Sequence, residues 1–288
     1  MSRSFRTFLG VDLGGGKGKT TAVARLVVED GHARVVEVSA RAPGGGAENG
    51  HGSAPFYDHV LCGYLARHAD GAVLGIDAPL TTTACVRCRL PECKTLSACD
   101  DPAVAWFRDV GARLLGGDGS GNGKANGHAR VGRKPAITPY TQRACEVLLH
   151  AHHQIGPRET LGQGMGPLTA RAAYLQRALE RQFRLGDNLI EVYPKATLTA
   201  LFGRRAQRYK RHPETWTTRA AMLEELSHDL RFDVWREGCL SNDHCFDAVV
   251  CAYTAYLWAR DGWEIPAEHR HIFAEDGWIW FPPMATTG

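Results

Sequence analysis

Short runs of apolar, β-branched residues open the chain, and each run is bounded by turn residues. They cover residues 8–13, 20–28 and 33–40, with the turn signal Asp30-Gly31 between the last two. Extended apolar runs joined by short turns are typical of antiparallel strands. The pattern therefore predicts a three-stranded antiparallel meander at the start of the fold.

A helical pattern comes next, followed by further strands. Between residues 57 and 68 the apolar positions return every three or four residues, and residues 72–77 form a continuous apolar run. Strand, helix, strand predicts a right-handed crossover that places 72–77 parallel to its partner. The next clear strand, 188–193, comes much later than a crossover requires, so residues 81–185 are expected to be an insertion.

Helical periodicity predicts five further helices. They span residues 102–115, 141–153, 168–184, 214–230 and 243–260, the last capped by Ser241 and Asn242. Glycine-rich residues 44–52 and 116–132 are expected to be flexible, the aromatic stretch 277–283 to pack on the core, and 284–288 to form a tail. We therefore expect an α/β fold whose mixed sheet combines the meander with parallel strands. We expect it to form a single domain over residues 1–283 with a helical, cysteine-rich insertion.

Composition limits the classes of protein to which this chain can belong. It has 288 residues, 44% of them apolar, and a formal net charge of +3, which suffices for a full core and excludes a strongly basic tail. No run of about 18 apolar residues occurs, so no membrane span is expected. The N-terminus leads into a strand rather than an apolar signal core, which makes the cytoplasm the expected location.

Five carboxylates occupy positions that favour one shared site. Asp12 ends the first strand and Asp77 the fourth, Glu191 lies inside the apolar fifth strand, and Asp243 and Asp247 lie one turn apart at a helix start. Clustered like charges are costly unless a cation neutralises them, and hard oxygen ligands select Mg²⁺ or Mn²⁺. Such ions support phosphodiester cleavage.

Three of these five carboxylates also have a structural explanation. Asp12 and Asp77 can be turn or cap residues, and Asp243 a first-turn residue favoured by the helix dipole. Asp247 is harder to explain, because it opens an almost wholly apolar stretch and needs a partner there. The joint pattern therefore favours the metal site.

Four cysteines predict a second, softer metal site. Cys85, Cys88, Cys93 and Cys99 follow the spacing C-x2-C-x4-C-x5-C. Four thiolates suit tetrahedral Zn²⁺, and they also hold [4Fe–4S] clusters, so the spacing leaves both open. The structural alternative is a loop of free thiols or a redox sensor. The other five cysteines lie in apolar helical contexts or at helix ends and are expected to pack.

Basic residues supply candidate phosphate contacts. Lys17 and Lys19 lie in the glycine-rich turn after the first strand, Arg205 and Arg208 in the densest cationic run, and Arg143 one helical turn before Glu146. Arg143 and Glu146 are either an ion pair or a phosphate clamp with its orienting residue. For the lysines and the cationic run, the alternative is a solvated surface.

The glycine-lysine turn raises the question of a nucleotide-binding loop. Gly18-Lys19-Thr20 lacks the glycine that a P-loop requires five positions earlier, because residue 13 is Leu. Asp12-Leu13-Gly14 followed by Thr20 or Thr21 is similar to the phosphate hairpin of actin-like and sugar-kinase ATPases. That class also needs a second Asp-x-Gly loop, and here Asp77 is followed by Ala-Pro.

Several of these blocks together resemble one family. The blocks at residues 10–14, 75–80, 143–146, 191–194 and 247–255 are similar to the motifs of a domain-of-unknown-function family described as predicted nucleases with a ribonuclease-H-like fold. The helix with Asp243 and Asp247 also resembles the C-terminal acidic helix of RuvC-type resolvases. The resemblance implies Asp12, Asp77 and Asp247 as metal ligands, with Glu191 and Asp243 in support.

These observations favour a metal-dependent nuclease that acts on DNA or RNA. The four-cysteine loop would then be structural or would contact nucleic acid. One alternative is an actin-like nucleotide phosphohydrolase. Another is a non-catalytic nucleic-acid-binding protein that keeps the fold and the metal loop.

Overall fold

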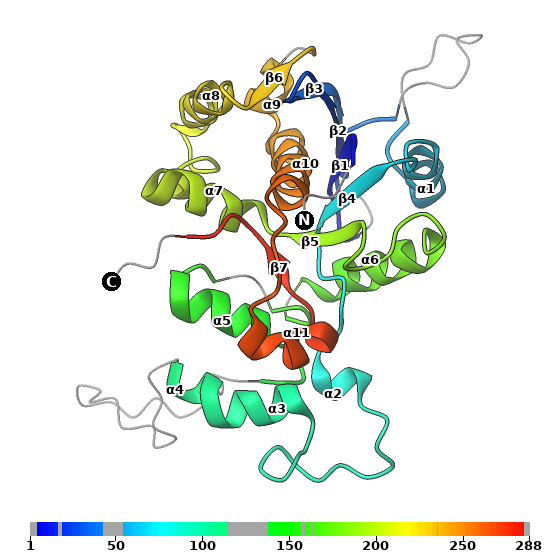
Figure 1. Cartoon of the computed structure of the whole chain (residues 1–288), viewed down its shortest axis with the longest axis vertical. Helices are drawn as coiled ribbons and strands as arrows, with labels where there is room; N and C mark the ends of the chain where they lie inside the picture. Colours follow the sequence, from blue (N-terminus) through cyan, green and yellow to red (C-terminus); the bar gives the residue numbers. More distant parts are fainter. Residues whose placement is uncertain are drawn as a thin grey trace. The chain divides into compact units, whose positions relative to one another are not determined.

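The computed structural model describes residues 5–16, 19–42, 54–114, 138–156, 159–162, 164–234 and 236–284 (Figure 1). The chain forms two compact units. The first contains Met1–Leu80, Ala170–Glu264 and Ile279–Gly288, and the second contains Thr81–Thr169 and Ile265–Trp278. The expected insertion, 81–185, is therefore longer than the first segment of the second unit, which ends at Thr169. The second unit also contains the C-terminal segment Ile265–Trp278. Lys17, the two glycine-rich segments from residue 44 to 52 and from 116 to 132, and the tail after residue 284 lie outside the described residues.

A seven-stranded mixed sheet forms the centre of the first unit, in the order β6-β3-β2-β1-β4-β5-β7. The predicted meander is present and antiparallel, and β4 and β5 follow parallel to β1 as expected. The strands are β1 (Thr7–Asp12), β2 (Ala22–Glu29), β3 (His32–Ser39), β4 (Ala72–Asp77), β5 (Leu189–Val192), β6 (Leu230–Phe232) and β7 (Ile279–Trp280).

The two outermost strands were not predicted. β6 and β7 have three and two residues, too few for an alternating pattern to be recognised, and each pairs parallel to its neighbour. The predicted helix at 214–230 ends at Leu226 because the chain turns there towards β6. The aromatic stretch 277–283 contributes β7, and Trp280 packs edge-on against Trp258.

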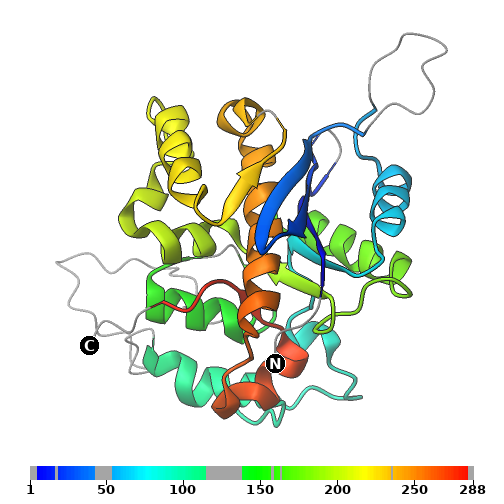
Figure 2. The same ribbon diagram turned by 45° about the horizontal axis from the view of Figure 1, so that its top comes forward.

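Helices cover both faces of this sheet (Figures 1 and 2). Helix α10 lies across one face, where it contacts β1, β2 and β4, and α1 and the C-terminal part of α6 lie on the other side. The helices of this unit are α1 (Asp58–Arg67), α7 (Pro194–Phe202), the 3-10 helix η2 (Gly203–Gln207), α8 (Thr215–Leu226), α9 (Glu237–Ser241) and α10 (Asp243–Asp261), with α6 (Gly166–Ala178) at the boundary between the units.

Two glycines let α10 approach the sheet closely. A Cβ on Gly10 of β1 would lie 2.0 Å from the carbonyl oxygen of Ala248, and a Cβ on Gly75 of β4 would lie 2.7 Å from that of Cys251. Gly10 and Gly75 are paired across the two strands. The backbone of α10 therefore rests directly on the backbone of the two central strands, a packing that any larger residue would prevent.

The two ends of α10 are capped by residues that the sequence indicates. The Asn242 side chain accepts hydrogen bonds from the backbone N–H groups of His244 (3.0 Å) and Cys245 (3.4 Å), and Gly262 ends the helix in the left-handed conformation. Ser241 was expected to share this capping role. Instead it belongs to α9, and its hydroxyl donates to the Glu237 carbonyl.

The second unit is helical. Its elements are α2 (Ala84–Arg87), α3 (Pro102–Trp106), the π-helix η1 (Phe107–Gly111), α4 (Ala112–Leu114), α5 (Ala144–His153), the 3-10 helix η3 (Ala267–His269) and α11 (Arg270–Asp276). The predicted helix at 102–115 is thus helical through residue 114, with a π-turn at its centre. Trp106 packs against Phe107 and Phe273 in the core of this unit. In the described part of the chain, no helix is both long and apolar enough to cross a bilayer.

Candidate functional site

Two aspartates meet at the ends of the central strands. Asp12 of β1 and Asp77 of β4 are direct neighbours in the parallel register. Each follows its glycine by two positions, so each side chain points to the face on which α10 lies. Asp12 is buried and Asp77 is partly exposed. The spacing Gly-x-Asp on both strands thus places two carboxylates beside one helix.

Helix α10 brings Asp247 to the same place. Asp247 precedes Cys251 by one helical turn, and Cys251 lies over Gly75. Burial raises the pKa of Asp247, Lys210 opposes this shift, and the negative charge of Asp12 adds to it. The resulting pKa of Asp247 is about 7. Burial, followed by the charges of Asp12 and Asp247, also raises the pKa of Asp77 well above its ordinary value. The three carboxylates therefore form one electrostatically coupled group, which we call the acidic site.

A lysine and a histidine contact the acidic site. Lys210 Nζ lies 2.5 Å from Asp247 Oδ2 and 3.6 Å from Asp243 Oδ2. His244 Nδ1 lies 2.6 Å from Asp12 Oδ2, and this hydrogen bond raises the pKa of the imidazole. Sequence reasoning missed both residues. Lys210 lies in the same cationic run as Arg205 and Arg208 but was not among the candidate residues. His244 lies between Asp243 and Asp247 at the start of the helix, and this position was the signal that could have identified it.

One carboxylate oxygen in the acidic site lacks a partner. Asp247 is 1% exposed, and its Oδ1 is buried without a hydrogen-bond partner among the residues that the structure describes. An unpaired buried carboxylate oxygen is costly, and a bound cation removes the cost. As the side chains stand, however, no three His, Cys, Asp or Glu residues in the described ranges already form a metal-binding group. The three carboxylates are hard oxygen donors, the type that suits Mg²⁺ or Mn²⁺.

Glu191 and Asp243 occupy supporting positions. Glu191 is buried in β5, pairs with Ile76 in the register, and its Oε2 accepts a hydrogen bond of 2.9 Å from the backbone N–H of Leu80. It therefore holds the chain that leaves β4. Burial disfavours the Asp243 carboxylate, but Lys210 and His244 outweigh this and lower its pKa. Asp243 is half-buried at the rim of the acidic site.

The turn after β1 is held from the outside by an arginine that sequence reasoning missed. Arg171 of α6 donates to the Thr21 hydroxyl (2.7 Å), to the Gly14 carbonyl (2.5 Å) and to Asp58 (2.7 Å). The Thr21 hydroxyl also accepts a hydrogen bond from the Gly14 N–H at 3.1 Å. Both lone pairs of this hydroxyl oxygen therefore accept hydrogen bonds from within the protein. Lys19 is exposed on this turn.

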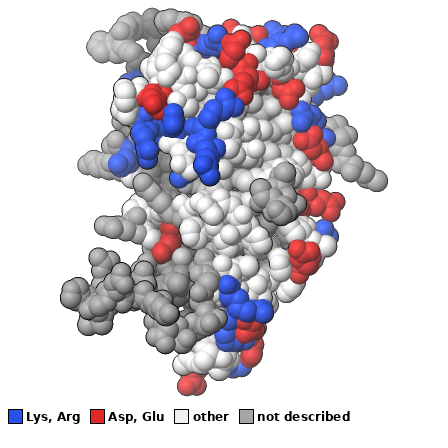
Figure 3. Space-filling view, turned by 90° about the vertical axis from the view of Figure 1, so that its left-hand side faces the viewer, with Lys and Arg blue, Asp and Glu red and all other residues white. Residues whose placement is uncertain are grey.

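The cationic run forms an exposed basic surface on the first unit. Figure 3 shows Lys and Arg side chains gathered on the side that bears α7 and α8. Arg205 pairs with Glu225, and Arg208 lies 3.5 Å from Glu214. Both arginines line a surface hollow with Thr217 and Thr218 of α8, and Trp216 of the same helix is 52% exposed. The exposed basic residues of this surface are Arg204, Arg205, Arg208, Lys210 and Arg211.

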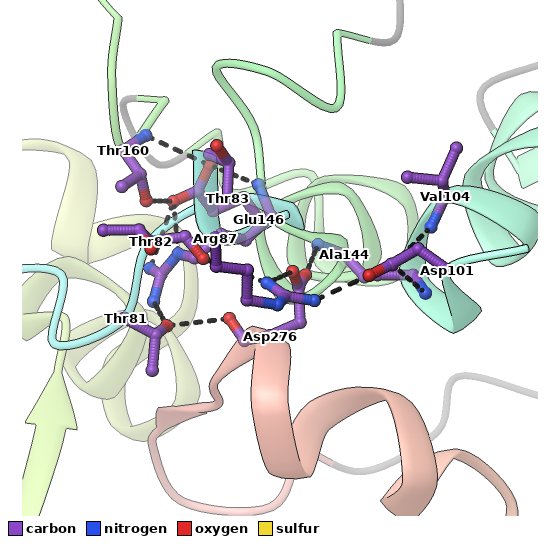
Figure 4. A network of polar contacts seen from close by, with 12 residues as sticks. Thr81, Thr82, Thr83, Arg87, Asp101, Val104, Ala144, Glu146, Thr160 and Asp276 are labelled. Atoms are coloured by element: carbon purple, nitrogen blue, oxygen red, sulfur yellow. Dashed lines mark hydrogen bonds and ion pairs between the residues drawn. The ribbon is translucent and has the colours of Figure 1, made fainter. Parts of the chain in front are cut away.

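Arg143 belongs to a buried network in the second unit, and Figure 4 labels its partners Thr81 and Glu146. Its guanidinium is 1% exposed and donates to Glu146 Oε1 at 3.1 Å and to the Thr81 hydroxyl at 2.8 Å. The nearby buried Asp276 pairs with Arg87 at 2.7 Å. Of the two roles open for Arg143, the ion pair is the one observed, and its burial leaves the guanidinium turned away from solvent.

The four cysteines lie on one irregular loop of the second unit. Cys85 is half-buried in α2, Cys88 and Cys93 are exposed, and Cys99 is half-buried. Burial raises the pKa of the Cys85 thiol, and the thiols of Cys99, Cys93 and Cys88 add to this effect, which indicates that the loop folds back on itself. Arg108 of η1 donates to three backbone carbonyls near Cys99, at 3.2–3.3 Å.

Comparison with known proteins identifies a family. The family model described as "Protein of unknown function (DUF429)" matches residues 10–271 of the chain. No curated protein and no solved structure matches. The matched region contains all five predicted carboxylates and the four cysteines.

Proposed function

The chain belongs to the DUF429 family, whose description assigns no activity. From the acidic site we propose that the protein is a divalent-metal-dependent nuclease. It would hydrolyse phosphodiester bonds of DNA or RNA. One observation carries this proposal. Asp247 lies beside Asp12 and Asp77 with a buried oxygen that has no partner among the described residues. Metal-dependent phosphoryl transfer requires such a convergence of carboxylates.

The arrangement of strands supports a ribonuclease-H-like fold for this chain. An antiparallel meander is followed by the parallel strands β4 and β5, and β1 and β4 are neighbours. This is the mixed sheet expected from the resemblance to predicted nucleases. In such a sheet the ends of the central strands are where an acidic site forms.

In the proposed site, Asp12, Asp77 and Asp247 hold Mg²⁺ or Mn²⁺. When bound, the ion would neutralise charge on the phosphate and activate water for attack. Glu191 holds the turn after β4 in place through the Leu80 N–H, and His244 orients the Asp12 carboxylate. These two residues keep the ligands positioned.

We propose that the exposed basic surface binds the phosphate backbone of the substrate. Arg205 and Arg208 are exposed, and each pairs with a surface glutamate that phosphate can replace. The exposed Trp216 of α8, the helix that contributes Thr217 and Thr218 to the same hollow, offers a face on which a base can stack. Lys19, on the exposed turn after β1, and Lys17 are further phosphate contacts in this proposal, and Arg143 is excluded from it by its burial.

Cleavage of labelled nucleic acid tests the proposed activity. Purified protein is incubated with single- and double-stranded DNA and RNA, with Mg²⁺ or Mn²⁺ and then with EDTA, beside Asp12→Asn as the inactivated control. We expect cleavage of at least one substrate that requires the ion and Asp12. Failure to cleave every strand type with both ions would refute the nuclease. ATP turnover would instead favour the actin-like phosphohydrolase, and binding without turnover the non-catalytic alternative.

We also propose a thiolate metal site at the four-cysteine loop. The thiols of the loop interact electrostatically, and Arg108, from outside the loop, donates a hydrogen bond to the Cys99 carbonyl. A metal ion held by Cys85, Cys88, Cys93 and Cys99 would explain how so exposed a loop keeps its conformation. Zn²⁺ and a [4Fe–4S] cluster both suit four thiolates.

Metal analysis of anaerobically purified protein checks this thiolate site. We expect close to one equivalent of zinc in a colourless sample, or about four of iron in a brown one. Cys88→Ser and Cys93→Ser should each lose most of the metal, whereas the control Cys62→Ser, in α1 of the first unit, should retain it. A metal-free protein with four reactive thiols in the loop would contradict the site.

A cytoplasmic location agrees with the state of the cysteines. All nine are free thiols in this structure. Free thiols and thiolate metal sites persist where the compartment is reducing. We therefore propose that the protein acts in the cytoplasm.

A further inference from the structure

Lys210 belongs to the exposed basic surface, and its ammonium group also contacts the aspartates of the acidic site. Its Nζ is 2.5 Å from Asp247 Oδ2 and 3.6 Å from Asp243 Oδ2. Of these partners, Asp247 is almost fully buried and Asp243 is half-buried. The ammonium group thus contacts one aspartate of the proposed metal site and one at its rim.

Neighbouring aromatic residues hold Lys210 in this position. The ammonium lies 5.4 Å from the centre of the Tyr209 ring, and the Tyr209 ring packs at 5.7 Å against Phe246, one residue before Asp247. Tyr209 is buried, and its carbonyl oxygen accepts a 2.9 Å hydrogen bond from the buried Arg219. These contacts therefore anchor the backbone at Lys210 and limit where its side chain can reach.

The two oxygens of Asp247 have different surroundings. Oδ2 contacts Lys210, whereas Oδ1 is buried and has no partner within the described part of the chain. Because the two oxygens of a carboxylate face different directions, one side of Asp247 already meets a cation and the other side does not. A second divalent ion between Asp247 and Asp243 would have to displace the ammonium group.

We infer that Lys210 takes the place of a second metal ion, so that the acidic site binds a single divalent cation at Asp247 Oδ1, together with Asp12 and Asp77. This inference rests on the proposed metal-dependent function. Lys210 neutralises the Asp247–Asp243 side permanently, and its half-exposed side chain remains accessible to a substrate phosphate. Lys210 is thus a positioning residue that sets the number of ions and the charge of the site.

The stoichiometry of Mn²⁺ binding tests this inference without relying on activity. Wild type, Lys210→Met, Lys210→Arg and the control Lys195→Met are titrated with Mn²⁺ by calorimetry and by electron paramagnetic resonance. The same titration of Asp77→Asn corrects for ions bound elsewhere. We expect one ion at the acidic site of the wild type, of Lys210→Arg and of Lys195→Met. Lys210→Met should bind two, with spectra that show coupling between neighbouring Mn²⁺ ions.

The outcomes separate this inference from the proposed function. If the wild type binds no Mn²⁺ that depends on Asp77, the proposed metal site itself fails. If the wild type binds one ion and Lys210→Met also binds only one, whether more tightly or not, Lys210 is a competitor or a structural partner and the inference is overturned. If the wild type already binds two, it is overturned as well. Where cleavage is found, its dependence on Mn²⁺ concentration should become steeper in Lys210→Met.

Discussion

Asp77→Asn is expected to abolish metal-dependent cleavage while making the metal-free protein more stable. The loss should be about a thousandfold or more, because one ligand of a metal that stabilises the transition state contributes several kcal/mol. The gain in stability follows from charge. Burial and the neighbouring carboxylates of Asp12 and Asp247 disfavour ionised Asp77, and asparagine has nearly the same shape without that charge.

Two measurements made on the same sample check this prediction. Thermal unfolding in EDTA should shift upward by roughly 2–4 °C, the change that about 1 kcal/mol produces in a protein of this size. Added Mn²⁺ should stabilise the wild type but not the variant. Asp243→Asn is the matched control, because Asp243 is half-buried at the rim and interacts mainly with Lys210. It should reduce cleavage far less, and an equal loss in both variants would argue against Asp77 as a ligand.

Gly10→Ala is expected to destabilise the first unit severely. The added Cβ would lie 2.0 Å from the Ala248 carbonyl oxygen and 2.4 Å from the Ala252 nitrogen, both in the backbone of α10. Backbone cannot move aside as a flexible side chain can, so the whole helix would have to shift away from β1. We expect a loss of at least about 4 kcal/mol, at the upper end for a single methyl group.

The glycines of the chain provide a graded series for this test. Gly75→Ala should cost less, about 2–3 kcal/mol, because its nearest contact is 2.7 Å. Gly63→Ala is the control, because Gly63 is exposed in α1 with nothing within 4 Å, and alanine there should stabilise by up to about 1 kcal/mol. Urea denaturation followed by circular dichroism gives the midpoints. Equal midpoints for Gly10→Ala and Gly63→Ala would mean that α10 does not rest on β1.

If Gly10→Ala still folds, the proposed metal site should bind Mn²⁺ more weakly. A helix lifted from β1 would carry Asp247 away from Asp12 and Asp77. The affinity for Mn²⁺ should therefore fall in Gly10→Ala, and Gly63→Ala should keep the wild-type affinity. The same close packing would thus control both stability and the separation of the carboxylates.

Much of the first unit is predictable because its signals are local. β1 and β4 are continuous apolar runs, the turn at Asp30-Gly31 has positive φ at both residues, and Asn242 starts α10 with a cap that can be recognised in the sequence. The candidate ligands were found for the same reason. Asp12 and Asp77 end their strands, and Asp247 is a charge in an apolar helix. Local patterns do not predict β6 and β7. These two segments are strands only because each has a neighbouring strand with which to pair.

The sequence by itself determined the strands β1 to β5, the long apolar helix and the candidate carboxylates, because propensity and periodicity depend on near neighbours. Only the tertiary structure decided which charges meet. His244 and Asp12 are far apart in the chain, yet they are in contact because α10 rests on Gly10. Lys210 and Asp247 are also distant in sequence, and they meet where Tyr209 packs against Phe246 of α10. It also decided that Arg143 is a buried partner of Glu146 rather than an exposed phosphate ligand. Charge pairing and burial depend on packing between distant segments, which no local pattern contains.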